Sequence, residues 1–172
     1  MKYTLRVIQG DITQMMTDAI VNAANTRLLG GEGVDGAIHK AAGPELLTAC
    51  RSLQGCEVGE AKITKAFQLP CKYVIHTVGP VWEGGDANEE NLLYSAYTNC
   101  LNLAMQYRLH SISFPNISTG VYHYPKEKAA KVALSACKEF LSNHFLIEEI
   151  VFVCYDHKNF ELYSNILHPQ IK

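Results

Sequence analysis

The chain has 172 residues and a formal net charge of −2; 48% of its residues are hydrophobic and 19% are charged. This length suits one domain that buries about 70% of the surface that its unfolded chain exposes, and the composition is that of a soluble globular protein. The net charge does not provide the basic surface with which proteins grip nucleic-acid phosphates, so we expect no strong nucleic-acid binding.

The cysteines, the histidines and the N-terminal residues narrow the class of protein further. The six cysteines form no CxxC pair and no zinc-ligand spacing, and we interpret them as reduced core residues. The scattered histidines give no metal-ligand spacing either. No signal peptide is recognisable, and no segment approaches the length of a membrane-spanning helix. We therefore expect a cytoplasmic protein with no membrane segment, no metal and no other cofactor.

Strand-like and helix-like segments alternate along the chain. Hydrophobic periodicity predicts, in order, strands at residues 3–9 and 18–25, helices at 37–42 and 44–54, strands at 61–67 and 73–78, a helix at 88–107, a strand at 111–114, a helix at 125–141, a strand at 147–154 and a last helix that ends near Leu167. There are no repeats and no low-complexity segments. This alternation predicts a three-layer α/β/α sandwich.

A glycine-rich stretch, GGEGVDGAIHKAAG, occupies residues 30–43. Four of its first seven residues are glycines, which allow a backbone to approach a ligand closely. A glycine loop that runs into a helix presents unpaired N–H groups and a positive dipole end, which suit an anion such as phosphate. Asp35 lies inside this turn, where its carboxylate would face the ligand. The alternative interpretation is that Asp35 caps the following helix.

Loops that follow other predicted strands carry side chains suited to a nucleotide. In α/β sheets, ligands bind at the carboxyl ends of the strands. Asp11 offers an acceptor for an exocyclic amine such as that of adenine, Tyr155 offers an aromatic face for a base, and Asn25 can bond ribose hydroxyls. Residues 30–36 and 118–122 contain no lysine or arginine, so a phosphate would be bound through backbone N–H groups. The implied ligand is an adenine nucleotide with a diphosphate, with or without a second sugar.

Five motifs together resemble the successive signatures of macrodomains. They are GDIT (10–13), VNAAN (21–25), GGEGVDGAIHKAAG (30–43), ISTGVYHYP (117–125) and VCYD (153–156). The Gly-Val-Asp-Gly form of the third resembles the MacroD-type branch, which includes bacterial O-acetyl-ADP-ribose deacetylases. The resemblance extends over essentially the whole chain. It implies a single macrodomain over residues 1–172, a three-layer α/β/α sandwich with a mixed, mostly parallel central sheet.

The resemblance also implies a role for each matching residue. Asp11 would bind the adenine amine beside the Ile12 backbone, and Tyr155 would pack on the adenine. The distal ribose would lie between Asn25 and Tyr122. The diphosphate would be cradled by Gly33, Val34, Ser118, Thr119, Gly120 and Val121.

The implied activity is that of a hydrolase that binds ADP-ribose and cleaves ester-linked groups from it. Asp35 and Asn25 would be the catalytic residues, with Asp35 ordering or activating the attacking water. The substrates would be O-acetyl-ADP-ribose and mono-ADP-ribose on acidic side chains of proteins. The alternatives are a non-catalytic reader of ADP-ribose and a phosphatase that acts on ADP-ribose 1″-phosphate. The partners would thus be ADP-ribose, its acetyl ester and mono-ADP-ribosylated proteins, and we expect a monomer.

Other polar residues near these motifs receive a structural interpretation. Glu32 stands where the MacroD-type branch carries another glycine; a bound diphosphate would repel its carboxylate, so we expect Glu32 to point to solvent. We interpret Asn22 as a residue that holds loops together. His39 and His76 have no Cys or Ser partner that would complete a triad, and we interpret both as structural. His123 has no chemical role that the motifs support.

Overall fold

A single sheet runs through the middle of the molecule. The computed structural model describes residues 3–169, and its strands lie in the order β1-β6-β5-β2-β4-β3. Their bounds are Thr4–Gln9 (β1), Ala19–Ala23 (β2), Ala61–Lys65 (β3), Tyr73–Thr77 (β4), Ser111–Phe114 (β5) and Glu149–Cys154 (β6). Neighbouring strands are parallel except β3 and β4, which are antiparallel. The prediction of a mixed, mostly parallel sheet is confirmed.

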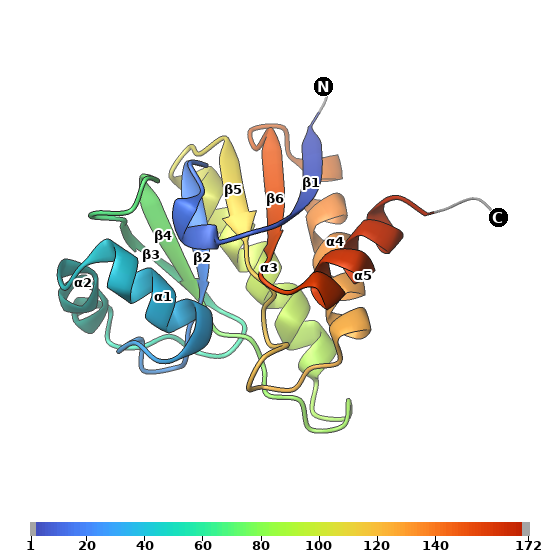
Figure 1. Cartoon of the computed structure of the whole chain (residues 1–172), viewed down its shortest axis with the longest axis horizontal. Helices are drawn as coiled ribbons and strands as arrows, with labels where there is room; N and C mark the ends of the chain where they lie inside the picture. Colours follow the sequence, from blue (N-terminus) through green and yellow to red (C-terminus); the bar gives the residue numbers. More distant parts are fainter. Residues whose placement is uncertain (1–2, 170–172) are drawn as a thin grey trace.

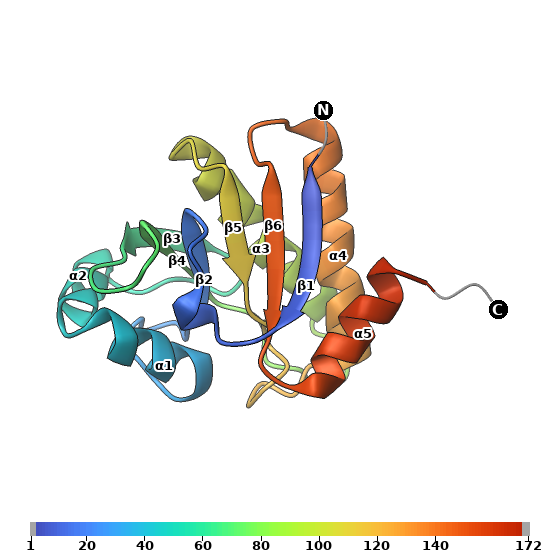
Figure 2. The ribbon, with the colours of Figure 1, turned by 45° about the horizontal axis from the view of Figure 1, so that its top comes forward.

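Helices cover both faces of the sheet (Figures 1 and 2). Their bounds are Gly33–Ala42 (α1), Glu45–Leu53 (α2), Glu89–Gln106 (α3), Lys126–Asn143 (α4) and His157–Leu167 (α5), and a short 3-10 helix, η1, spans Ile12–Gln14. The helices α1 and α2 pack on one face, and α3, α4 and α5 pack on the other. The predicted three-layer α/β/α sandwich is therefore confirmed.

Alternation along the strands divides the core into two apolar layers. On β6, Ile150 and Phe152 face the layer of α3, α4 and α5, whereas Val151 and Val153 face the layer of α1 and α2. Burying each such large apolar side chain stabilises the fold by about 1.5–3 kcal/mol. The cysteines are free thiols, and all but the half-buried Cys71 are buried. In the described part of the chain, no helix is both long and apolar enough to cross a membrane.

The helix α1 begins earlier than the sequence predicts. It starts at Gly33 rather than at residue 37, so Asp35 lies in its first turn. Ile38 and Ala42 are fully buried and fix this helix against the sheet, and that packing outweighs the low helix propensity of glycine. The loop also fits closely on the first turn, because a Cβ atom on Gly36 would lie 2.6 Å from the Gly31 carbonyl oxygen.

The start of α3 also differs from the prediction. Asn88 precedes the helix as expected, but its side chain accepts from Asn91 Nδ2 at 2.8 Å and caps no backbone N–H among the described residues. The buried Glu89 carboxylate instead accepts three backbone N–H groups from the preceding loop, at 2.6–2.9 Å. These bonds hold the pKa of Glu89 below its usual value. The Glu89 carboxylate therefore orders the loop of residues 83–87.

The sheet order brings distant segments of the chain to one edge. Because β1, β6, β5 and β2 are parallel, their carboxyl ends lie together at the lower edge of the sheet in Figure 2. The segments that follow these strands, and the start of α1, meet there. The sequence motifs singled out above occupy these segments.

Candidate active site

A cleft of about 920 Å³ lies at the carboxyl ends of the parallel strands. A cleft of this size can enclose a nucleotide. All of the site residues expected from the sequence line it: Asp11, Ile12, Asn25, Gly33, Val34, Asp35, Ser118, Thr119, Gly120, Val121, Tyr122 and Tyr155. The structure therefore brings together residues that are more than 140 positions apart in the chain, while the roles expected of them remain predictions.

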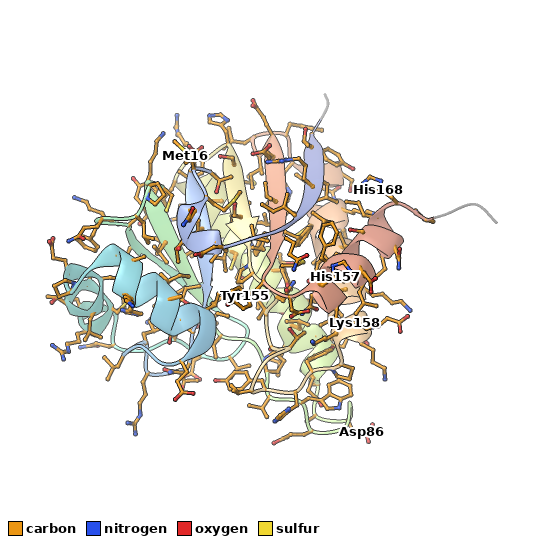
Figure 3. All side chains as sticks on the ribbon, viewed as in Figure 1. Met16, Asp86, Tyr155, His157, Lys158 and His168 are labelled. Carbon is orange, nitrogen blue, oxygen red and sulfur yellow. The ribbon has the colours of Figure 1, made fainter. Side chains whose placement is uncertain are left out.

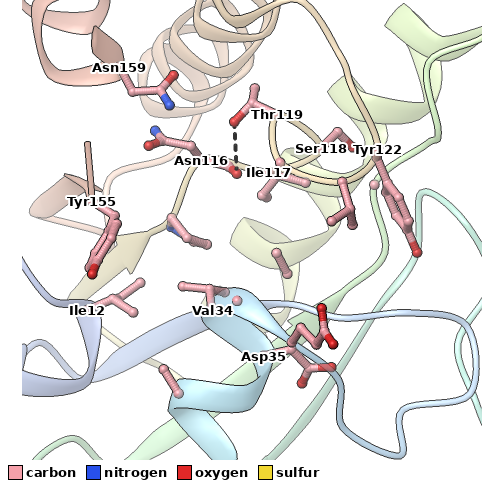
Figure 4. Close-up of a pocket in the computed structure, with 18 of the residues that line it drawn as sticks. Ile12, Val34, Asp35, Asn116, Ile117, Ser118, Thr119, Tyr122, Tyr155 and Asn159 are labelled. Carbon is pink, nitrogen blue, oxygen red and sulfur yellow. Dashed lines mark hydrogen bonds between the residues drawn. The ribbon is translucent and has the colours of Figure 1, made fainter. Parts of the chain in front are cut away.

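The lining residues follow an order along the cleft (Figure 4). Tyr155 and Ile12 lie at one end, and Asp35 and Tyr122 lie at the other. Val34 lies between the two ends, facing the segment of Ser118 and Thr119 across the cleft. An elongated ligand would therefore extend from an aromatic and apolar end to an acidic end.

The buried Asp35 carboxylate is held through its Oδ1 atom. Asn22 donates from Nδ2 to Asp35 Oδ1 at 2.9 Å, and His39 Nε2 lies 3.4 Å from the same oxygen. The other oxygen, Oδ2, faces Gly31: a Cβ atom on Gly31 would lie 3.0 Å from Asp35 Oδ2 and 3.5 Å from Asn25 Nδ2. One carboxylate oxygen is thus anchored from behind, and the second lies toward the glycine loop and Asn25.

The Asn25 amide organises the loop that follows β2. Its Oδ1 accepts from the backbone N–H groups of Arg27 and Leu28, each at 3.2 Å. Its Nδ2 donates to the Gly30 carbonyl oxygen at 3.0 Å. A side-chain amide carries two N–H donors, and the second hydrogen of Asn25 Nδ2 has no acceptor within residues 3–169.

Asp11, Ile12 and Tyr155 form the aromatic end of the cleft. Asp11 Oδ1 accepts from the Thr13 backbone N–H at 2.9 Å and from Thr13 Oγ1 at 2.7 Å, which caps η1. The capping role expected of Asp11 is therefore present, and Asp11 Oδ2 accepts no hydrogen bond from any described residue. The Tyr155 side chain is 83% exposed and stands beside Ile12 at the surface (Figures 3 and 4). Its ring offers an uncovered apolar face.

Backbone N–H groups line both walls in the middle of the cleft. In an α-helix the first N–H groups have no intrahelical acceptor, and Gly33 and Val34 are the first residues of α1. On the opposite wall, residues 119–121 donate no backbone hydrogen bond to any described residue. These two sets of free donors suit an anionic group placed between them.

Ser118 holds the second wall in a strained conformation. Its φ of 68° lies in the left-handed region, which is costly for a residue with a Cβ atom. Its buried hydroxyl has no hydrogen-bond partner among the described residues. A Cβ atom on Gly79 would lie 2.1 Å from Ser118 Oγ and 2.6 Å from Ile117 Cγ2, so a larger residue at position 79 would force these side chains to shift.

Acidic side chains outnumber basic ones around the cleft. Asp11, Glu32, Asp35 and Asp156 line it, and Lys126 is the one basic residue among the described lining residues, so the formal charge is four negative against one positive, or −3. Lys126 Nζ lies 3.7 Å from Asp156 Oδ1, and both side chains are partly exposed. The Glu32 side chain is exposed, as expected. An anionic ligand would therefore depend on the backbone N–H groups.

Sequence reasoning missed the two residues that hold Asp35. The Asn22 amide contacts Asp35 and His76 rather than holding loops together. His39 was interpreted as structural, yet it lies against the Asp35 carboxylate. The spacing of four residues from Asp35 to His39 would have revealed this pair had α1 been predicted to begin at Gly33, because residues four apart share a helix face.

The described residues show no metal-ligand cluster, and burial keeps two thiols near the site protonated. Residues 3–169 contain no group of three or more His, Cys, Asp and Glu side chains arranged to hold a metal ion. Burial raises the pKa of Cys50, which lies near His76, and that of Cys154, at the end of β6, to about 11 in each case. Both thiols are therefore protonated at neutral pH and are poor nucleophiles. The Asp35 carboxylate, by contrast, lines the cleft and is held there by Asn22 and His39.

The architecture and the elongated cleft define a three-layer α/β/α domain that binds a ligand at the carboxyl ends of its strands. The chain matches the family model described as Macro domain over residues 21–133. It is 53% identical over 174 residues to the O-acetyl-ADP-ribose deacetylase of Escherichia coli (strain K12), covering 99% of this chain and 98% of that protein. This chain belongs to the macrodomain family.

Solved structures agree with this assignment. The Oceanobacillus iheyensis macrodomain with ADP has a TM-score of 0.93 and 45% sequence identity, covering 96% of this chain and 90% of that one. The Trypanosoma brucei macrodomain in complex with ADP-ribose has a TM-score of 0.91 and 43% identity, covering 95% of this chain and 68% of that one. The fold is thus that of macrodomains.

Proposed function

We propose that this protein binds ADP-ribose along the cleft and hydrolyses its esters. The substrates are O-acetyl-ADP-ribose, which yields ADP-ribose and acetate, and mono-ADP-ribose attached to acidic side chains of proteins. The relative from Escherichia coli is named for the first activity, and related solved structures hold ADP or ADP-ribose. We further infer that residues 1–172 act as one macrodomain.

The proposed binding mode follows the order of the lining residues. The adenine packs on Tyr155, and its amine donates to Asp11 Oδ2, the oxygen that the η1 cap leaves free. The diphosphate lies between the α1 N-terminus and residues 119–121, where both walls present unpaired N–H groups. The distal ribose then reaches the acidic end, where Asn25 retains one free amide hydrogen.

The observation that carries the catalytic proposal is the orientation of Asp35. Its Oδ1 is anchored by Asn22 and His39, so that Oδ2 is the oxygen able to accept a hydrogen bond from a water molecule beside the ester. Asp35 orders or activates this water, which adds to the ester carbonyl carbon. The bond from that carbon to the sugar oxygen then breaks, the sugar oxygen takes a proton, and the carboxylic acid leaves.

The ester between ADP-ribose and a glutamate or aspartate side chain presents the same carbonyl group. The difference lies in the leaving acid, which is a protein side chain instead of acetate. Because the Asp35 end of the cleft is bordered by the exposed residues Gly31 and Glu32, an acyl group there extends toward solvent. This geometry favours an acceptor too large to be enclosed.

A non-catalytic reader of ADP-ribose is the alternative that one observation favours. Glu32 adds a carboxylate to a cleft that already carries a formal negative charge, which would disfavour an anionic substrate. A reader uses the same Asp11, Tyr155 and backbone contacts but makes no use of the anchored Asp35. Turnover therefore separates the two functions.

The test measures acetate release from O-acetyl-ADP-ribose and calorimetric binding of ADP-ribose, for the wild type and for Asp35→Ala. Positioning and proton handling each contribute about 10²–10⁴-fold in enzymes. We expect the variant to lose at least about 10²-fold in kcat and to keep its ADP-ribose affinity. Binding without acetate release by the wild type would support the reader. An Asp35→Ala variant with full turnover would refute the role of Asp35.

A further inference from the structure

A chain of polar side chains lies behind Asp35 inside the apolar layer of α1 and α2. Asn22 on β2, His76 on β4 and Thr64 on β3 are buried on the sheet face that otherwise carries residues such as Ile20 and Val74. Asn22 and His76 are register partners on adjacent parallel strands. Burying polar groups there is unfavourable unless their hydrogen bonds are made. Hydrogen bonds join the three residues to one another and to Asp35, and Asn22 Oδ1 is the polar atom among them that has no partner among the described residues.

The chemistry of the side chains decides which atom donates and which accepts in each hydrogen bond between Asp35, Asn22 and His76. Asn22 Nδ2 lies 2.9 Å from Asp35 Oδ1 and 3.1 Å from His76 Nδ1. An ionised carboxylate only accepts, so Asn22 must present an N–H group to Asp35. Its second N–H then points to His76 Nδ1, which must accept.

These hydrogen bonds also determine which nitrogen of the His76 imidazole ring carries the proton. When Nδ1 of a neutral imidazole accepts, Nε2 carries the proton and donates. His76 Nε2 lies 3.0 Å from Thr64 Oγ1 and 3.7 Å from Cys50 Sγ. The Thr64 hydroxyl is therefore the acceptor that keeps the proton on Nε2. The opposite tautomer would require Asn22 to turn its carbonyl oxygen toward His76 and hence toward Asp35, where two acceptors would repel.

We propose that His76 is a positioning residue: in its Nε2–H tautomer, fixed by Thr64, it sets the orientation of the Asn22 amide and thereby holds the Asp35 carboxylate. The effect of this positioning on turnover rests on the hydrolase function proposed above. His76 lies behind the residues that line the cleft and touches no substrate. Its effect on turnover passes through Asn22 to Asp35 Oδ1.

The surroundings of His76 favour the neutral ring that this role requires. Burial, together with a smaller effect of the nearby His39, lowers the pKa of His76 to about 3. The ionisable groups around the ring are His39, Asp35 and the Cys50 thiol, whose own pKa burial raises. Across the physiological pH range the ring is therefore uncharged, and its tautomer is the property that its neighbours set.

The first test replaces the acceptor of the His76 proton. Thr64→Val removes the hydroxyl with little change of shape, and Thr77→Val is the matched control. Thr77 is a buried threonine on β4 whose hydroxyl donates to the Glu60 carbonyl oxygen at 2.7 Å, away from Asp35. Misplacing a reacting group by a fraction of an ångström to 1 Å costs up to about 100-fold in rate. We expect Thr64→Val to lower kcat by about 10-fold or more at unchanged KM, and Thr77→Val to retain wild-type kcat.

A pair of substitutions at His76 guards against a result caused by misfolding. His76→Leu removes the acceptor for Asn22, whereas His76→Asn places an amide oxygen near the position of Nδ1. We expect kcat to fall in the first variant and to be largely restored in the second, with ADP-ribose affinity unchanged in both. Equal kcat in the leucine and asparagine variants would overturn the proposal.

The decisive measurement does not depend on turnover. Long-range ¹H–¹⁵N spectra of the ¹⁵N-histidine-labelled wild type identify the tautomer of each ring, with His76→Asn used to assign the signal. We expect an Nε2–H tautomer for His76 and a loss of this preference in Thr64→Val. An Nδ1–H tautomer in the wild type would overturn the role of His76 whatever the activity. Absence of acetate release with an Nε2–H tautomer would instead refute the hydrolase and leave the positioning of Asp35 supported.

Discussion

Gly31 lies directly against the Asp35 carboxylate, so a methyl group there would fit only if the carboxylate shifted by a few tenths of an ångström. A Cβ atom at position 31 would stand 3.0 Å from Asp35 Oδ2, closer than side chains normally pack. The φ angle of Gly31 is outside the left-handed region, so alanine would fit the backbone there. Glycine at position 31 is therefore needed to leave space for the Asp35 carboxylate, and not to allow a particular φ angle.

Gly31→Ala is expected to impair catalysis more than binding. The added methyl group pushes on Asp35 Oδ2 and on Asn25 Nδ2, and a small displacement of the carboxylate costs about 10-fold or more in kcat. Steady-state kinetics with O-acetyl-ADP-ribose measure the effect. The control is Gly10→Ala, where the nearest atom, Ile8 Cδ1, would be 3.9 Å from the new Cβ atom. Wild-type kcat in Gly31→Ala would show that Oδ2 is not the working oxygen.

Asp11→Ala is expected to impair binding more than catalysis. It removes the proposed acceptor of the adenine amine, and a hydrogen bond to a charged group contributes about 1.5–3 kcal/mol, or roughly 10-fold to 100-fold in affinity. Calorimetry with ADP-ribose measures the loss. Asp11→Asn separates this role from capping, because asparagine also caps helices but carries one acceptor oxygen fewer. A stable Asp11→Asn protein with wild-type affinity would contradict the adenine contact.

Glu32→Gln is expected to bind ADP-ribose more tightly than the wild type. The substitution keeps the size of the side chain and removes one negative charge from the rim of a cleft that binds a diphosphate. Because the Glu32 side chain is exposed, the gain should be about 3-fold to 10-fold at low ionic strength and should shrink as salt is added. Glu45→Gln at the start of α2, outside the cleft, is the control. Equal affinities of Glu32→Gln and the wild type at every salt concentration would show that Glu32 stays clear of the ligand.

The buried His76 predicts a pH dependence of stability. The pKa of His76 in the folded protein is about 3 against an ordinary value of 6.5, so below pH 6.5 the unfolded chain binds a proton that the folded chain excludes. The free energy of unfolding therefore falls as pH falls from 6.5 toward 3, by up to about 1.4 kcal/mol per pH unit from this group. Urea unfolding of the wild type and His76→Asn between neutral pH and about pH 5 tests this. The stability difference should narrow as pH decreases; parallel curves would exclude a neutral buried His76.

Local sequence patterns were sufficient to predict the bounds of some helices and strands, but not of those that depend on packing against the sheet. The strand predicted at residues 111–114 has these bounds in the structure, where Ile112 and Phe114 alternate with small serines and are fully buried. The start of α1 was predicted too late, since the glycines signal a loop and only packing against the sheet makes them helical. The meeting of the loops at the cleft was predicted because they follow parallel strands, which end at one edge; most of the individual lining residues were implied by the resemblance to macrodomains.

Contacts that depend on strand register could not be predicted in this way. Asn22 and His76 meet because β2 and β4 are adjacent in the sheet, although the chain visits β3 between them. Nothing in the spacing of 54 residues between them indicates that neighbourhood. Gly79 and Ser118 are another such pair, whose close fit arises from two loops packing together.

The order of strands in the sheet also determines at which stage of folding the cleft can form. One wall follows β2, the other follows β5, and the two strands pair through Ala19 and Ile112, so both walls are in place only after a long-range pairing has formed. Such pairings are slow steps in folding because a large loop must close first. During synthesis the ribosome must therefore deliver most of the chain before any ligand can be held. Ligand binding then stabilises only the completed fold, which makes ADP-ribose a reporter of full maturation in a refolding experiment.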